Sequence, residues 1–301
     1  MASPQAAKDL AGFLRPYAEA VNAAIEKWLS DASVPAALAE AMRYASLDAG
    51  KRIRPALVML SAEAVARPES WAAEPTPAAV AIELVHCYSL VHDDLPPMDD
   101  DALRRGRPSA HVKFGQAMAI LAGSALLTRA FEVLSLGLAD ASIAAKLVAE
   151  LAAAAGPAGM IAGQVADMGL CPVPDGAEGG KYIHLRKTGA MIRAAARMGG
   201  ICAGADAKKL QALTGFGEKI GLAFQITDDL LDATQPTEML GKTAGKDVRD
   251  RKRSYATELG IEPARRLARE VTDQALAALE GLGPRAAKLR DLAALLSRRN
   301  R

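Results

Sequence analysis

The sequence predicts an all-α protein with a single domain, and three observations support that prediction. Alanine, leucine, arginine and glutamate recur throughout, whereas aromatic residues make up only 4% of the 301 positions, which is typical of helical proteins. Apolar residues return at helical spacing almost from end to end, and no strand pattern competes with them. The breaks between these segments are too short and not polar enough for a domain linker. We therefore expect residues 1–301 to fold as one bundle of helices.

The expected helices follow this periodicity in chain order, and proline or glycine marks the breaks. Prolines punctuate 67–77, prolines and glycines fill 171–180, and Gly-Leu-Gly-Pro occupies 281–284. Each break ends a helix because these residues disfavour helical geometry or lack a backbone donor. The predicted helices span residues 5–30, 34–49, 54–66, 77–94, 115–137, 140–154, 157–169, 179–203, 206–232, 262–280 and 285–298.

Two segments, 115–137 and 185–203, are apolar around most of their circumference, with small residues such as Gly123 at mid-segment. Helices of that kind are buried centrally or face another subunit. A homodimer and a central core helix in a monomer explain the pattern equally well.

Composition also limits the partners and the compartment. A formal net charge of +2 is too small to indicate a nucleic-acid partner. Cys87, Cys171 and Cys202 have unrelated spacings and no paired-cysteine metal pattern, which favours a reduced cytosolic compartment. The N-terminus lacks a basic region followed by an apolar stretch, and no stretch approaches the roughly 20 apolar residues that span a bilayer. We expect a cytoplasmic protein without membrane insertion.

Two acidic clusters carry the chemistry. So many carboxylates beside apolar helical runs repel one another and lose hydration on burial, so a helical core needs compensating cations. Mg²⁺ prefers oxygen ligands and usually takes one or two carboxylates plus substrate phosphates. The clusters therefore predict a magnesium-diphosphate site. Its candidate ligands are Asp93, Asp94 and Asp99 in the first cluster and Asp228, Asp229 and Asp232 in the second.

Spacing indicates how these carboxylates can converge. Asp228 and Asp232 lie four residues apart on a helical segment, so they share a face and can share a metal. The Pro-Pro pair at 96–97 ends the preceding helix, so Asp93 sits on its last turn and Asp99 returns beside it.

Basic residues follow both clusters and can bind phosphate oxygens. Arg104 and Arg105 come after the first cluster, and six lysines and arginines within 242–253 come after the second. The motif GKRIRP at 50–55 places cations before the positive end of a helix, and an exposed basic loop is an equal alternative for it. The 242–253 stretch could also be a nucleic-acid patch, although no aromatic residue interrupts it.

Two helical segments add further candidates. His86, Ser89 and Asp93 are spaced i, i+3, i+7, so His86 shares the face of a proposed ligand; a satisfied structural histidine is the alternative. Lys187 and Thr188 pair a cation with a hydroxyl donor in an otherwise apolar helix. A buried lysine needs a partner, and a diphosphate would serve.

These residues closely resemble the trans-isoprenyl diphosphate synthases, particularly bacterial farnesyl diphosphate synthases. The similarity runs in order over about residues 40–256, through the motifs GKRIRP, DDLPPMDDDALRRGRP, KTG, FQITDDLLD and GKTAGKD. The resemblance implies the isoprenoid synthase fold, with helices around a deep central cavity, and a prenyltransferase that is usually dimeric. Such an enzyme condenses isopentenyl diphosphate with dimethylallyl and geranyl diphosphates to give farnesyl diphosphate.

The resemblance also implies roles for individual residues. Asp93, Asp99 and Asp228 would be the main ligands of three Mg²⁺ ions, supported by Asp94, Asp229 and Asp232. The allylic diphosphate would be held by Arg104, Lys187, Thr188, Gln225, Lys242 and Lys252, with Lys187 acting on the leaving group. Isopentenyl diphosphate would be held by Lys51, Arg54, His86 and Arg105.

Product length would be set by residues one to one-and-a-half turns before Asp93, where the growing tail meets the cavity floor. Helical geometry places Ser89 nearer the pocket, but only Tyr88 is bulky, and the resemblance to farnesyl synthases includes an aromatic residue there. We therefore expect Tyr88 to limit the product to fifteen carbons, against the alternative of an ordinary core tyrosine.

Other functions remain open at this stage. A geranylgeranyl diphosphate synthase of the same family is one alternative, and a noncatalytic partner subunit is another, although such subunits commonly lose an aspartate motif. A nucleotide pyrophosphohydrolase would not need paired basic pockets. A terpene cyclase usually replaces the second aspartate motif with a mixed one.

Overall fold

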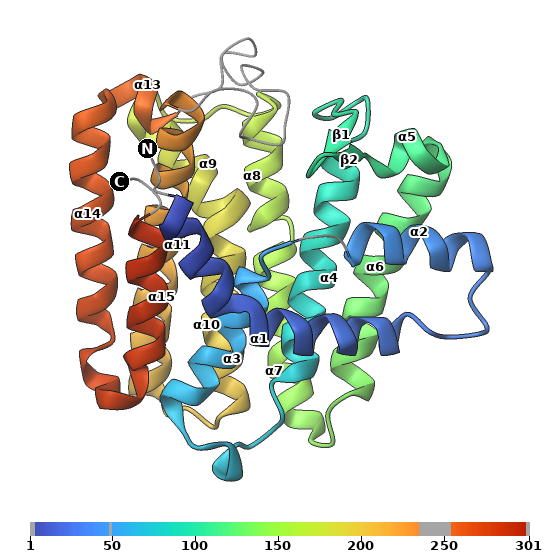
Figure 1. Cartoon of the computed structure of the whole chain (residues 1–301), viewed down its shortest axis with the longest axis horizontal. Coiled ribbons are helices and arrows are strands. Elements are labelled where there is room, and N and C mark those ends of the chain that lie inside the picture. The colour runs from blue at the N-terminus through green and yellow to red at the C-terminus, as the bar shows by residue number, and fades with distance from the viewer. Residues whose placement is uncertain (1–3, 48–49, 235–253, 299–301) are drawn as a thin grey trace.

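Helices make up almost the whole structure, a computed structural model that describes residues 4–47, 50–234 and 254–298 (Figure 1). The all-α prediction is confirmed. The described helices are α1 (Pro4–Trp28), α2 (Ala36–Ser46), α3 (Ile53–Val65), α4 (Thr76–Asp93), α5 (Ala110–Phe114), α6 (Gln116–Leu136), α7 (Ala141–Ala155), α8 (Met160–Asp167), α9 (Ala177–His184), α10 (Ala190–Cys202), α11 (Ala207–Thr234), α13 (Tyr255–Leu259), α14 (Ile261–Ala278) and α15 (Ala287–Arg298), with 3₁₀ turns η1 (Pro68–Ser70) and η4 (Glu280–Ala286) and a π-helix η2 (Leu185–Gly189).

The predicted helices are present, and the differences are local. The expected helix 179–203 is divided into α9 and α10 by the π-helix η2, a form of helix that occurs mainly as a single turn at functional sites. The short helices α5 and α13 are too brief to show periodicity in the sequence. A two-residue antiparallel pair, β1 (Leu103–Arg104) and β2 (Arg107–Pro108), also escaped prediction.

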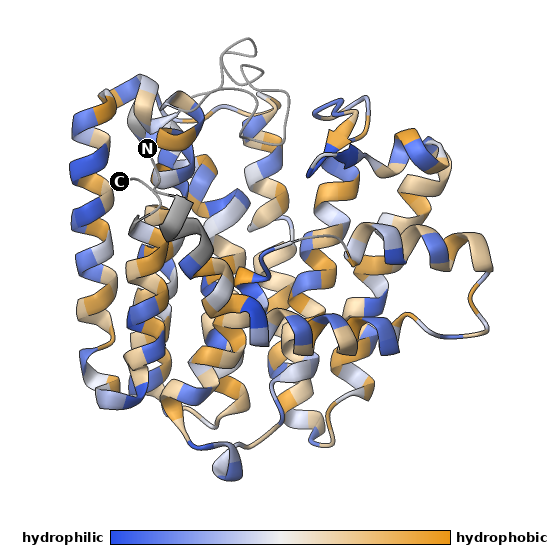
Figure 2. Cartoon of the chain, viewed as in Figure 1, coloured by the Kyte–Doolittle hydropathy of each residue, from blue (hydrophilic) through white to orange (hydrophobic). Residues whose placement is uncertain are grey.

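The core is built on central helices of small and aliphatic residues. Helix α10 packs against α3, α7 and α11, and α4 packs against α3 and α6. Figure 2 shows apolar residues along α4, α6 and α10 and more hydrophilic residues along the outer helix α14. Two helix backbones touch where a Cβ on Gly199 of α10 would overlap the Val58 carbonyl oxygen of α3. Glycine is needed at this position because no side chain fits.

The turn after α4 has the predicted geometry. The helix ends at Asp93, with Asp94 as its C-cap, and the two prolines at 96–97 follow. The chain then folds back, since the Asp99 N–H donates to the Asp93 carbonyl oxygen at 2.8 Å and the Asp101 N–H to that of Asp94 at 3.1 Å. All these carboxylates therefore lie at one end of α4.

Two segments are long and apolar enough to cross a membrane by length and composition, which corrects our expectation that no stretch approaches this limit. They are Gln116–Leu136 and Ala141–Asp167, with 39% and 44% of their apolar windows buried in the fold. The second is interrupted between α7 and α8. Core helices of soluble proteins share these features, and α6 packs on one side against α4.

The contact between α3 and α10 generates a prediction about stability. We expect Gly199→Ala to lower the free energy of unfolding by about 1–3 kcal/mol, the usual cost of overpacking, because its methyl group meets backbone. Gly215→Ala on α11 is the matched control, since its Cβ would meet only the Ala278 Cβ at 3.6 Å. It should be neutral or stabilising by up to about 1 kcal/mol. Urea unfolding of both variants measures the difference, and equal stability of the two would contradict the prediction.

Candidate functional site

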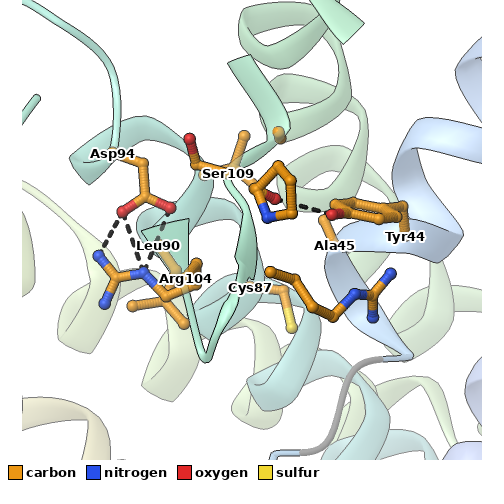
Figure 3. A pocket seen from close by; sticks show the side chains of 11 residues that line it. Tyr44, Ala45, Cys87, Leu90, Asp94, Arg104 and Ser109 are labelled. Atoms are coloured by element: carbon orange, nitrogen blue, oxygen red, sulfur yellow. Dashed lines mark hydrogen bonds and ion pairs between the residues drawn. The ribbon is translucent and has the colours of Figure 1, made fainter. Parts of the chain in front are cut away.

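The first acidic cluster is buried at the end of α4 and tied to two other elements. Asp93 is 7% exposed and accepts a hydrogen bond from Gln164 Nε2 of α8 at 2.7 Å. Asp94 accepts one from Arg104 Nε at 3.0 Å, and Arg104 Nη2 pairs with the same carboxylate (Figure 3). Arg104 Nη2 also lies 3.6 Å from Asp101 Oδ2. Burial raises the pKa of Asp93 and of Asp94, and these basic and amide partners only partly oppose that effect. A cation at this helix end would stabilise both carboxylates.

The second cluster lies on α11 and contacts the short helix α13. Asp229 accepts the Tyr255 N–H at 2.7 Å and lies 3.5 Å from His184 Nε2. The His184 ring stacks on the Tyr255 ring at a centroid distance of 5.5 Å. Burial, together with the charges of the neighbouring Asp228 and Asp232, raises the pKa of Asp229 to about 6, although His184 and the backbone donor oppose this shift. This cluster too holds more buried negative charge than its neighbours offset.

The π-helix η2 connects the two clusters. Lys187 Nζ lies 2.7 Å from Asp167 Oδ2, and Thr188 Oγ1 donates to Gln225 Oε1 at 3.1 Å. The same amide oxygen lies 2.9 Å from His184 Nδ1. The turn lies close against α8, because a Cβ on Gly163 would overlap the backbone of Lys187.

Lys187 has a protein partner that was not predicted from the sequence. Asp167 meets the need of this buried lysine for a partner, and its contact with a diphosphate stays a prediction. Burial opposes the charge of Lys187, but Asp167 and Asp93 attract it strongly enough to raise its pKa. Lys187 therefore stays protonated beside the first acidic cluster.

A basic cluster consists of Arg54 at the start of α3, His86 on α4 and Arg105 between β1 and β2. Arg54 is partly exposed, but its Nε is buried and has no hydrogen-bond partner among the described atoms. Burial lowers the pKa of Arg54, and the charge of Glu83 opposes this. The pKa of His86 lies well below its ordinary value because of burial and the nearby guanidinium groups of Arg54 and Arg105. A buried donor without an acceptor costs about 1–3 kcal/mol, so this cluster fits an anion.

The basic and acidic groups are near enough to affect one another electrostatically. Arg54 interacts with Asp228 of the second cluster, and Lys187 interacts with Asp93 and Asp99 of the first. Within the described ranges, no three carboxylate, histidine or cysteine groups converge on a single metal position. The arrangement fits Mg²⁺, which takes few protein carboxylates and completes its shell with water and phosphate oxygens.

The other predicted residues are placed as follows. Lys51 is exposed in the loop before α3, and Asp232 is partly exposed one turn after Asp228. The Arg105 guanidinium lies against Gly50, where a Cβ would overlap it. Lys242 and Lys252 lie outside the described residues.

Tyr88 and Ser89 are both buried on α4. Tyr88 is 6% exposed, and its ring meets that of His92 edge to face at 5.6 Å. His92 Nε2 lies 3.2 Å from the Ile120 carbonyl oxygen of α6, and a Cβ on Gly123 would overlap the His92 ring. The Ser89 hydroxyl donates to the His86 carbonyl oxygen of its own helix. Tyr88 is thus held by His92, which is itself anchored on α6.

A small cavity of ≈ 30 Å³ lies behind Asp94, between α2, α4 and the β1–β2 hairpin (Figure 3). Tyr44 closes one side, with its hydroxyl donating to the Pro108 carbonyl oxygen at 2.7 Å and Arg107 lying 4.1 Å over its ring. A water molecule needs roughly 10–15 Å³ of such space. The cavity has room for about two waters and none for a prenyl chain.

Sequence reasoning missed three residues of the site: Gln164, Asp167 and His184. Gln164 and Asp167 stand three positions apart on α8, so they share a helix face, and that spacing of an amide and a carboxylate was the available signal. His184 lies three positions before Lys187, but nothing in its own segment indicates that it meets α11.

The comparisons with known proteins agree with this geometry. A polyprenyl synthetase family model matches residues 35–282. Geranylgeranyl pyrophosphate synthase 12 of Arabidopsis thaliana is 46% identical over 253 residues, which cover 82% of this chain and 69% of the relative. An FPP/GFPP synthase from Zymomonas mobilis has a TM-score of 0.82 at 34% identity and covers 97% of this chain and 98% of its own. A geranyltransferase from Helicobacter pylori, solved with magnesium and isoprenyl diphosphate, has a TM-score of 0.79 at 33% identity, covering 94% and 96%.

The family match extends over most of the chain and includes the described motifs that converge at the site. The regions 50–55, 93–108, 187–189 and 224–232 all lie inside it. The two acidic clusters and the facing basic cluster are the parts of the fold that these motifs build. The chain therefore belongs to the polyprenyl synthetase family.

Proposed function

We propose that this protein joins isopentenyl diphosphate to an allylic diphosphate in a Mg²⁺-dependent reaction and that it extends the chain to geranylgeranyl diphosphate. The observation that carries the proposal is that buried acidic groups and a basic group with a buried, unpartnered nitrogen interact electrostatically across the site. Asp93 and Asp228 stand for the acidic side, and Arg54, with its unpartnered buried Nε, stands for the basic side. Magnesium bound with isoprenyl diphosphate in the Helicobacter pylori relative supports the same ligand pair.

The allylic diphosphate belongs on the acidic side, where bound Mg²⁺ would neutralise the charge that develops on the leaving diphosphate. Lys187 is held protonated by Asp167 and lies beside that position, so it stabilises the same charge. Gln164 keeps one oxygen of Asp93 fixed through its hydrogen bond. These residues bind and orient the group that leaves.

Isopentenyl diphosphate belongs on the basic side, held by Arg54, Arg105 and His86. His86 is neutral near pH 7 because of its lowered pKa, so it can donate one hydrogen bond without adding charge. Holding the second substrate in this pocket places its double bond toward the ionising allylic carbon. No nucleophilic side chain is required, and the released diphosphate can accept the proton that the product loses.

Two observations bear on product length, and they favour different products. The curated relative at 46% identity is a geranylgeranyl synthase, as are further relatives at 42–43% identity, and this supports twenty carbons. Tyr88 is buried between one and one-and-a-half turns before Asp93, and its ring contacts His92. This supports fifteen carbons as the second candidate. The solved relative from Zymomonas mobilis is named an FPP/GFPP synthase; because FPP is the fifteen-carbon product, that candidate stays open.

The direct test is an assay of the purified protein. We expect isopentenyl diphosphate with dimethylallyl, geranyl or farnesyl diphosphate to give prenyl diphosphates, identified by mass spectrometry, and chelation of Mg²⁺ to abolish them. Asp228→Asn should lower turnover by orders of magnitude without unfolding the protein, because an amide is a poor ligand for Mg²⁺. Near wild-type turnover of this variant at saturating Mg²⁺ would rule out the ligand role. Release of diphosphate without carbon–carbon bond formation would contradict the proposed reaction.

The wall made by Tyr88 gives a separate prediction about length. Tyr88→Ala should lengthen the main product by at least one five-carbon unit relative to wild type, because it opens space one turn below the metals. Chain-length analysis of extracted products measures this. Tyr17→Ala is the control, since Tyr17 lies on α1 beside Glu63 and should leave length unchanged. If a folded, active Tyr88→Ala protein keeps the wild-type length, the floor lies elsewhere.

We also propose that the protein is a homodimer formed through α6. Ile120, Leu121 and Leu136 expose 47%, 58% and 69% of their surfaces on this helix, whose other side packs against α4. A second copy would cover them.

Light scattering should give about twice the 31.4 kDa chain mass, and Leu121→Lys should shift the measured mass toward that of the monomer. Leu170→Lys, at a residue that is 69% exposed but lies after α8, should have no effect, and a wild-type monomer would refute the proposal.

A further inference from the structure

Arg52 lies in the middle of the GKRIRP motif, yet no binding role was assigned to it. It is 2% exposed, and it is the N-cap of α3 in a left-handed conformation with φ 53°. A residue with a side chain rarely adopts this conformation. It persists where the surrounding structure over-determines it, and such sites cluster near ligands and active sites.

Three elements hold the Arg52 guanidinium. Its Nη1 donates to Glu83 Oε1 of α4 at 2.7 Å, and its Nε donates to Asn22 Oδ1 of α1 at 2.8 Å. Its Nη2 donates to the Ser46 carbonyl oxygen at the end of α2. Both side chains of the Arg52–Glu83 pair are almost fully enclosed. The backbone immediately before α3 is therefore held from inside the fold at Arg52.

The fixed position of Arg52 constrains the basic residues around it. Lys51 precedes it on the surface, and Arg54 follows it on the first turn of α3 with an unpartnered buried Nε. Arg52 Nη1 also lies 2.9 Å from the position a Cβ would take on Gly50, where the Arg105 guanidinium rests. A shift of the Arg52 side chain would move the groups assigned to isopentenyl diphosphate.

Glu83 adds an electrostatic function to the same contact. Arg52, Arg54 and Arg105 crowd together, and Arg105 lowers the pKa of Arg54 while Glu83 raises it. The Glu83 carboxylate pairs with Arg52 at 2.7 Å, so its charge offsets repulsion among the guanidinium groups. The Nε of Arg54 then remains available to an anion.

We propose that Arg52 is a positioning residue for isopentenyl diphosphate: without touching the substrate, it holds Lys51, Arg54 and Arg105 in the geometry that binds its diphosphate. This inference rests on the proposed function. A merely structural role for Arg52 would lower stability without changing one substrate constant selectively.

The test compares steady-state constants of Arg52→Lys and wild type with both substrates. Lysine keeps the charge beside Glu83 but loses the fork that reaches Asn22 and Ser46 together. We expect KM for isopentenyl diphosphate to rise by about tenfold or more, as for one misplaced hydrogen bond to a charged group. KM for the allylic diphosphate should change by less than about twofold, well below the effect of one such bond.

Arg197→Lys is the matched control. Arg197 forms a bidentate pair with Glu150 and donates to Thr214 at 2.7 Å, joining α7, α10 and α11 as Arg52 joins α1, α2 and α4. This variant should lose thermal stability but keep both KM values.

If Arg52→Lys does not fold, Asn22→Ala decides, because it removes one acceptor of Arg52 and leaves the pair with Glu83. It should raise KM for isopentenyl diphosphate alone, by about threefold, a fraction of a charged hydrogen bond.

Arg54→Ala separates failure of this inference from failure of the proposed function. If Arg54→Ala raises KM for isopentenyl diphosphate while the folded Arg52 or Asn22 variant does not, the positioning role is wrong and the substrate assignment stands. If Arg54→Ala changes only the allylic constant, the substrate assignment is wrong, and the positioning role falls with it. A parallel loss for both substrates in Arg52→Lys would also overturn the positioning role.

Discussion

Buried charge that the fold does not fully compensate is the constraint on which the rest of this structure depends. Burial raises the pKa of Asp93, Asp94 and Asp229 and lowers the pKa of Arg54 and His86. Each side of the site is held in a state that an opposite charge would stabilise. In the proposed function, a magnesium diphosphate would supply both signs, because the carboxylates would hold the metal and the guanidinium groups would hold the phosphate oxygens. The desolvation cost of the free protein therefore becomes a source of affinity for that ligand.

The charged groups converge because regular helices are interrupted where they must meet. Helix α4 stops at Asp93, α3 begins after the left-handed Arg52, and the π-helix η2 reorients Lys187 and Thr188. An uninterrupted α-helix would project successive side chains around its axis and could not direct neighbouring residues to one point. Close backbone contacts complete the geometry, as where Gly163 lets α8 approach Lys187.

Local chemistry explains which parts of the site could be predicted from sequence. The fold class followed from periodicity, and the return of Asp99 beside Asp93 followed from two prolines, because both depend on neighbouring residues only. Asp167 as the partner of Lys187 depends on α8 packing against η2, which no local pattern encodes. The same holds for the contact between Arg52 and Glu83, 31 positions apart. Lys242 and Lys252 lie outside the described residues and stay predictions.

Overall similarity to known proteins and the side chains near the site favour different product lengths. Relatedness averages over the whole chain, whereas the length of a cavity depends on a few side chains at its floor, so relatives can share most residues and differ in product. Tyr88 is supported by other residues, because its ring contacts that of His92. His92 in turn packs against α6 at Gly123, where a side chain would overlap its ring. The spacing of α4 and α6 thus helps set the position of Tyr88. Since Leu121 is exposed on the side of α6 away from Gly123, a partner bound there would steady the helix that supports Tyr88.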